Sequence, residues 1–171
     1  MIEHKTKLLQ ALSTKNIKGV IEVLLSLRVN SLQISPELRK NLVYELIRND
    51  IFSLNTPTQD NMIISLITKD NYRLLHASLS LVSIVASTLK GVIYLMSNGK
   101  NILTHLIKMT ILLAKQQKTT SQPMAISVNL RFCIAILQKM SIKASLIPVF
   151  VEMGMIDFVL SKVEEHYKSP S

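Results

Sequence analysis

The chain has 171 residues, of which 48% are hydrophobic and 18% are charged, and its formal net charge is +9. This length fits one domain or a short repeat array, and the apolar content is ample for a buried core. A single cysteine excludes an internal disulfide and a metal site built from paired thiolates. The first residues lack the apolar run of a secretory signal, so we expect a cytoplasmic location.

Apolar residues recur at helical spacing along the whole chain, and strand-like alternation is nowhere sustained. Ser35 before Pro36 is typical of a helix start, while Gly99 and Gly154 follow apolar runs at positions typical of helix ends. The pattern predicts an all-α chain with helices, in order, at 3–12, 15–29, 37–49, 59–68, 72–88, 90–98, 101–116, 124–142, 143–153 and 155–167.

One of these helices contains an apolar run without Lys, Arg, Asp or Glu, from 74 to 89. The run is shorter than the roughly 20 residues that span a bilayer, and it is rich in serine. We therefore expect a buried helix there and no membrane span.

Acidic residues are confined to the two flanks of the chain. No Asp or Glu occurs from Asn71 to Val151, although nine Lys or Arg do, whereas basic and acidic residues balance in the flanks. This central stretch therefore carries the net charge and is expected to attract an acidic partner.

An internal repeat appears when the sequence is laid over itself at an offset of 55. Segment 80–86 then falls on 135–141, and segment 92–99 falls on 147–154, with large, small and glycine positions coinciding. Without the polar loop at 116–124, the unit is about 45 residues long, which is typical of repeats of two or three stacked helices.

Within each unit, a short helix ends in glycine, an apolar helix follows, and a long third helix carries a small-x-Leu-x-x-apolar-small signature, clearest in Ala135-Ile-Leu-Gln-Lys-Met-Ser141. This order resembles an armadillo repeat over about 72–167. The resemblance implies a right-handed α-solenoid of armadillo-like repeats at 71–167, with the last repeat incomplete and helical pairs at 1–70 continuous with it. Ile84 and Lys139 stand at the positions of the family's peptide-holding asparagines, so clamping of an extended peptide backbone is not expected.

Segment 131–143, followed by 153–158, is similar to the armadillo part of ciliary basal-body proteins that combine a LisH segment with such repeats. This chain has no visible LisH segment. The resemblance implies a microtubule-associated structural role at the cilium or basal body, with the acidic tails of tubulin as a candidate partner.

A catalytic role has little support in the residue pattern. The central stretch holds no carboxylate for general acid or base work, and the four histidines lack metal-ligand spacing. Cys133 shares a helix side with Leu130, Ile134, Leu137 and Met140, which favours a core thiol over a nucleophile. We therefore expect neither an enzyme nor a cofactor or metal site.

The basic residues instead indicate binding. Asn101, His105, Lys108 and Lys115 follow helical spacing along one stripe, and we predict that the partner contacts Arg73, His105, Lys108, Lys115, Arg131, Lys139 and Lys143. A simpler alternative is that these charges only keep the protein soluble. The function predicted is a non-catalytic protein–protein interaction module within a larger assembly, which binds an acidic protein surface; a nucleic-acid-binding helical domain is the alternative, less favoured because the stretch has few arginines and aromatics.

The last predicted helix has no third helix of its repeat after it. Ile156, Val159, Leu160 and Val163 would then lack part of their cover. Either the chain is part of a longer protein, or a partner supplies the missing face.

Overall fold

The computed structural model describes residues 2–55, 62–68, 70–97, 101–117, 119 and 121–168. These residues contain helices and turns and no strand, which confirms the predicted all-α class. The helices are α1 (Ile2–Ser13), α2 (Ile17–Leu32), α3 (Pro36–Arg48), α4 (Met62–Leu66), α5 (Tyr72–Val85), α6 (Leu89–Leu95), α7 (Asn101–Gln116), α8 (Pro123–Ser141), the 3-10 turn η1 (Ala144–Leu146), α9 (Ile147–Glu152) and α10 (Met155–Lys168).

The predicted helix ends that the structure describes have the expected causes. The Ser35 hydroxyl accepts a hydrogen bond from the Leu38 amide, and Pro36 opens α3. Gly154 has φ +67°, the left-handed conformation that lets α9 end and α10 begin. Gly99 and positions 59–61 of the predicted fourth helix lie outside the described residues.

Several predicted boundaries differ from the structure, three of them most clearly. Helix α2 runs three residues further than predicted, to Leu32, and at its end the Gln33 amide donates to the Val29 carbonyl. Helix α5 ends at Val85 because Thr88 caps the next helix by accepting from the Gly91 amide. The segment predicted as one helix at 143–153 divides into η1 and α9.

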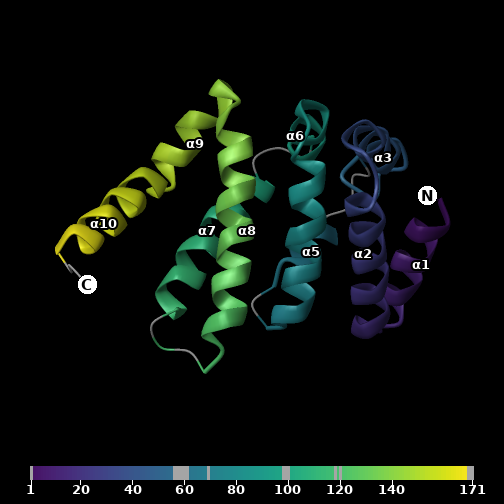
Figure 1. Cartoon of the computed structure of the whole chain (residues 1–171), viewed down its shortest axis with the longest axis horizontal. Helices are drawn as coiled ribbons and strands as arrows, with labels where there is room; N and C mark the ends of the chain where they lie inside the picture. Colours follow the sequence, from purple (N-terminus) through teal and green to yellow (C-terminus); the bar gives the residue numbers. More distant parts are fainter. Residues whose placement is uncertain are drawn as a thin grey trace.

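Three long helices, α2, α5 and α8, lie side by side as one layer, and α1 and α7 lie against it (Figure 1). Helix α3 and the short helices α6 and α9 gather at one end of the long helices (Figure 1). A short helix followed by an apolar helix and a long layer helix thus occurs as α6, α7 and α8, and its beginning recurs as α9 and α10.

Helices α5 and α8 are joined at matching positions. The Asn129 side-chain amide donates to the Tyr72 carbonyl at 3.2 Å, across 57 positions, and Lys139 Nζ donates to the Ser83 carbonyl at 2.8 Å, across 56. These spacings are close to the offset of 55 found in the sequence. The two helices therefore run parallel, with equivalent residues level to within one or two positions.

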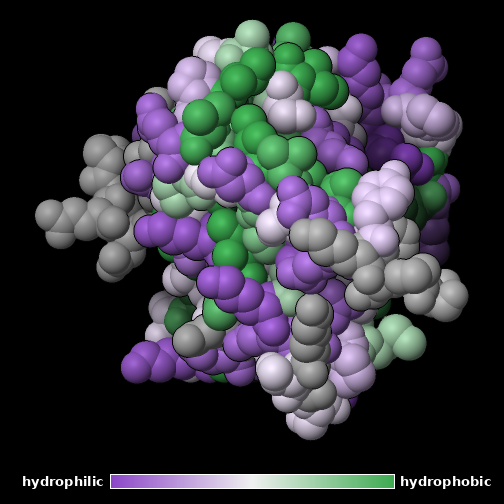
Figure 2. Space-filling view, turned by 90° about the vertical axis from the view of Figure 1, so that its left-hand side faces the viewer, coloured by the Kyte–Doolittle hydropathy of each residue, from purple (hydrophilic) through white to green (hydrophobic). Residues whose placement is uncertain are grey.

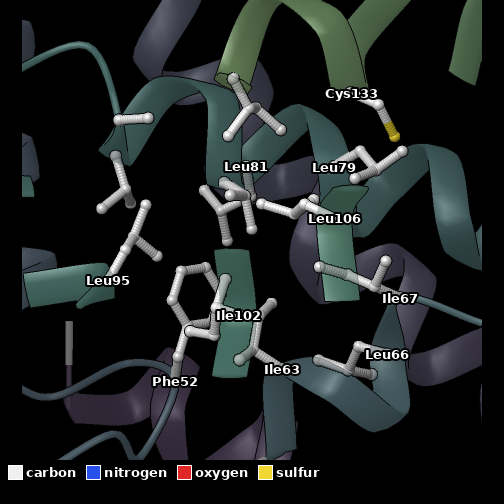
Figure 3. Packing of buried hydrophobic residues seen from close by; sticks show 14 of the residues in the cluster. Phe52, Ile63, Leu66, Ile67, Leu79, Leu81, Leu95, Ile102, Leu106 and Cys133 are labelled. Carbon is white, nitrogen blue, oxygen red and sulfur yellow. The ribbon is translucent and has the colours of Figure 1, made fainter. Parts of the chain in front are cut away.

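The core extends through the helix layer, with α5 at its centre. Figure 3 shows Phe52, Ile63 and Leu95 packed near Leu81 and Ile102, from elements far apart in the sequence. Most of α5 is buried, which confirms the predicted buried helix. Within the described residues no single helix is long and apolar enough to cross a membrane. Helix α8 and segment 144–152 together have the length and apolar composition of a span, but the chain bends by 116° between them.

Candidate functional site

A groove of about 1050 Å³ opens between α10 on one side and α7 and α8 on the other. Figure 1 shows α10 leaning away from α8 as it runs from α9 toward the C-terminus. Figure 2 views the molecule from this end, where hydrophobic side chains form a band bordered by hydrophilic ones. The groove is thus an elongated apolar surface at one end of the helix layer.

The walls of the groove are apolar stripes of two helices. Residues 130, 134, 137 and 141 of α8 follow helical spacing on one side of that helix, and Ile134 is 40% exposed. On α10, apolar residues three and four positions apart form the opposite stripe, in which Leu160 is 56% exposed. That stripe consists of Ile156, Val159, Leu160, Val163 and Tyr167.

Helix α9 and the turn after it close one end of the groove. Ile147 and Phe150 of α9 and Met155 at the start of α10 line it there. Helix α10 packs on α9, which packs on α7, and the left-handed turn at Gly154 sets the direction in which α10 leaves. The exposed α10 stripe confirms the expected lack of cover over Ile156 and its neighbours.

The border of the groove has an uneven charge. Helices α7 and α8 contain no Asp or Glu. Arg131 is exposed on α8, and it lies on the same face of the helix as the groove-lining Gln138, two turns away. Among the described lining residues the carboxylate is Glu165, and it is paired with Lys162 at 2.8 Å. The α7–α8 side therefore presents positive charge without a compensating acid.

The predicted binding residues fall into two groups in the structure. Two of them are held by internal hydrogen bonds: His105 Nε2 lies 2.7 Å from the Ile67 carbonyl, and Lys139 Nζ bonds the Ser83 carbonyl and hydroxyl. Burial lowers the pKa of Lys139. The exposed group comprises Arg73, Lys108, Lys115 and Arg131, with Lys143 partly exposed.

The sequence placed Ile134 on the same helix side as Cys133, but in the structure Ile134 is 40% exposed. Helical spacing places it beside Leu130 and Leu137, but α8 turns its 134 side toward the groove rather than toward a packed helix. The prediction for Cys133 is confirmed, because its thiol is fully buried. An apolar stripe alone does not tell a core face from an uncovered one.

Away from the groove, a polar cluster that the sequence did not indicate joins the three layer helices. Arg28 Nη1 of α2 lies 2.8 Å from His76 Nε2 of α5, and the guanidinium lies over the Phe132 ring of α8 at 5.5 Å. The His76 and Phe132 rings meet edge to face, with centroids 5.3 Å apart. Burial and the adjacent Arg28 charge lower the pKa of His76, so Nε2 accepts and Arg28 donates.

No protein-family model, no curated protein and no solved structure matches the chain. Functional assignment accordingly depends on the groove, its charged border and the residue patterns described above.

Proposed function

We propose that this protein is a non-catalytic interaction module, a right-handed α-solenoid of armadillo-like repeats that holds an acidic protein partner within a larger assembly. The observation that carries the proposal is the open apolar groove beside α7 and α8, whose outer surfaces carry exposed Arg131, Lys108 and Lys115 and no acid. Apolar contact would supply affinity, and the charges would speed association.

A repeat architecture is supported by the recurrence of helix order and by the level pairing of α5 with α8. In such arrays each unit buries its apolar face against the next, so an end unit leaves a face that needs a polar cap or a partner. Within the described residues the apolar stripe of α10 remains exposed and offers a partner a face of this kind.

The acidic tails of tubulin are one candidate partner, suggested by the resemblance to ciliary basal-body proteins. A microtubule-associated scaffold in the cytoplasm or at the basal body would follow from that resemblance. The negative charge of such tails would complement the acid-free surface.

The proposal can be tested by affinity capture from native lysate with the chain and with a variant carrying Lys108→Glu, Lys115→Glu and Arg131→Glu. Lys139 is left unchanged because its bond to Ser83 joins two helices. We expect a protein partner that is retained at low salt, weakened at high salt and lost in the variant.

Two results would argue against this function. If the triple variant captures the same proteins as the original chain, the three charges serve solubility alone. If the captured material is instead removed by nuclease, and the slope of log affinity against log salt concentration corresponds to several phosphate contacts, the chain is a nucleic-acid-binding domain.

A further inference from the structure

We propose that the groove between α10 and α8 binds an α-helix of the partner protein, with a broad apolar face and an acidic exposed flank. This inference rests on the proposed function and names the form and chemistry of the bound segment. The helix would lie against α10 and α8 in the way that α8 lies against α7 and α5.

The order of helices indicates what fits the groove. Short α6 is followed by α7, and α8 then packs on α7 and beside α5. Short α9 is likewise followed by α10. The groove then lies where a third helix, equivalent to α8, would pack. A helix in the groove would therefore be the next member of the layer α2, α5 and α8 (Figure 1).

The shape of the groove also suits a helix. Both walls are stripes of residues spaced three and four apart along helix axes, Leu130 to Ser141 on α8 and Ile156 to Tyr167 on α10. Ridges of side chains at this spacing receive the matching ridges of another helix. The volume of about 1050 Å³ is at the upper limit for small-molecule pockets, and the groove is an open channel rather than an enclosed one.

The charges around the groove indicate an acidic flank on the bound helix. Arg131 lies next to the α8 wall, and exposed Lys115 directly follows the lining residue Ala114 on α7, while neither helix carries an Asp or Glu. The described carboxylate of the lining, Glu165, is paired with Lys162 and so adds little repulsion. An acidic flank toward α7 and α8 would be attracted, whereas a basic flank would be repelled.

The test uses two designed peptides, each an amphipathic helix about as long as α10. Their apolar faces are identical, and the flanking residues are Glu in one and Lys in the other. Fluorescence anisotropy then gives the affinity of each peptide for the chain. We expect the Glu peptide to bind about tenfold or more tightly than the Lys peptide, with the difference reduced by salt.

Two groove variants locate the binding. Ile134→Asp and Leu160→Asp change exposed residues, so the chain should keep its helical circular dichroism, and each should weaken the Glu peptide about tenfold or more. Val29→Asp on α2 is the matched control, because Val29 is similarly exposed, at 47%, and lies on another helix; it should leave binding unchanged.

Three outcomes would overturn the inference. The first is that neither peptide binds, or that both bind equally. The second is that Val29→Asp weakens binding as much as the groove variants. The third is a dimer in sedimentation velocity that Leu160→Asp dissociates, since a second copy would then occupy the groove.

The same variants separate this inference from the proposed function. If the lysate partner is lost with the charge-reversed triple variant but retained by Leu160→Asp, the interaction module stands and the helix inference fails. If no lysate partner depends on either set of residues, the proposed function itself fails.

Discussion

Arg28 and His76 form a hydrogen bond of 2.8 Å between α2 and α5, although they are 48 positions apart in the sequence. Phe132 of α8 lies against both side chains, so the three helices of the layer meet at one point. The bond requires a neutral His76, because a protonated ring could not accept from Arg28.

Stability should therefore decrease in mildly acidic solution. The pKa of His76 is lowered in the folded state from the ordinary value of 6.5, so the unfolded chain binds more protons when the pH is below that value. The contribution is complete above the ordinary pKa and is lost as the pH falls through the lowered one. Urea unfolding between about pH 7.5 and pH 5 should show this decrease, and His76→Gln should make it smaller.

Arg28→Gln provides the control for the cause of this shift. Removal of the neighbouring positive charge should raise the pKa of His76 in the folded protein, as followed by the NMR shift of its ring protons. If the pKa does not move, burial alone holds it low. A His76→Gln chain with the same pH dependence as the original would contradict the prediction altogether.

Tyr94→Phe should destabilise the chain by about 1–3 kcal/mol, because it leaves a buried backbone donor without its partner. The Tyr94 hydroxyl accepts from the Phe52 amide at 3.0 Å and donates to Asp50 Oδ1 at 2.8 Å. These bonds fix the turn after α3 against α6. Chemical denaturation measures the loss, and Tyr44→Phe, which lies against lysine side chains on the surface, should change stability by less than about 0.5 kcal/mol.

Gly91→Ala should cost about 2–3 kcal/mol or prevent folding, because a Cβ at this position would overlap the carbonyl oxygen of Val85. The backbone of α6 would have to move away from the end of α5. Gly154→Ala is a useful comparison, since its Cβ meets open space and the cost is backbone strain at φ +67°, about 1 kcal/mol. Thermal melts of both variants should rank them in this order.

Cys133 should resist thiol reagents in the folded protein. Burial raises the pKa of its thiol to about 12, although a hydrogen bond with Thr110 opposes the effect. The thiolate fraction at neutral pH is thus very small, and reagent access is blocked as well. A chromogenic disulfide reagent should react with Cys133 only on unfolding in urea, while an added Ser145→Cys on the surface should react at once.

Rapid reaction of Cys133 in native buffer would show that α8 opens readily. It would also revive a nucleophilic role for the residue, which the buried geometry argues against.

Local sequence determined the helices of this protein, because helix periodicity, caps and breakers act within a few residues. Ser35 and Pro36 predicted the start of α3, and the left-handed Gly154 predicted the end of α9. The acid-free stretch from Asn71 to Val151 is likewise a property of the sequence itself.

Tertiary packing decided which apolar and basic side chains remain available. His105 and Lys139 read as surface charges, yet Ile67, just after α4, and Ser83 of α5 offer them carbonyl partners that helical spacing does not reveal. Ile134 shares an apolar helix side with Cys133, yet α10 departs from Gly154 in a direction that leaves Ile134 exposed in the groove. Such outcomes depend on the relative placement of helices distant in sequence, so the local pattern that forms each helix leaves them undetermined.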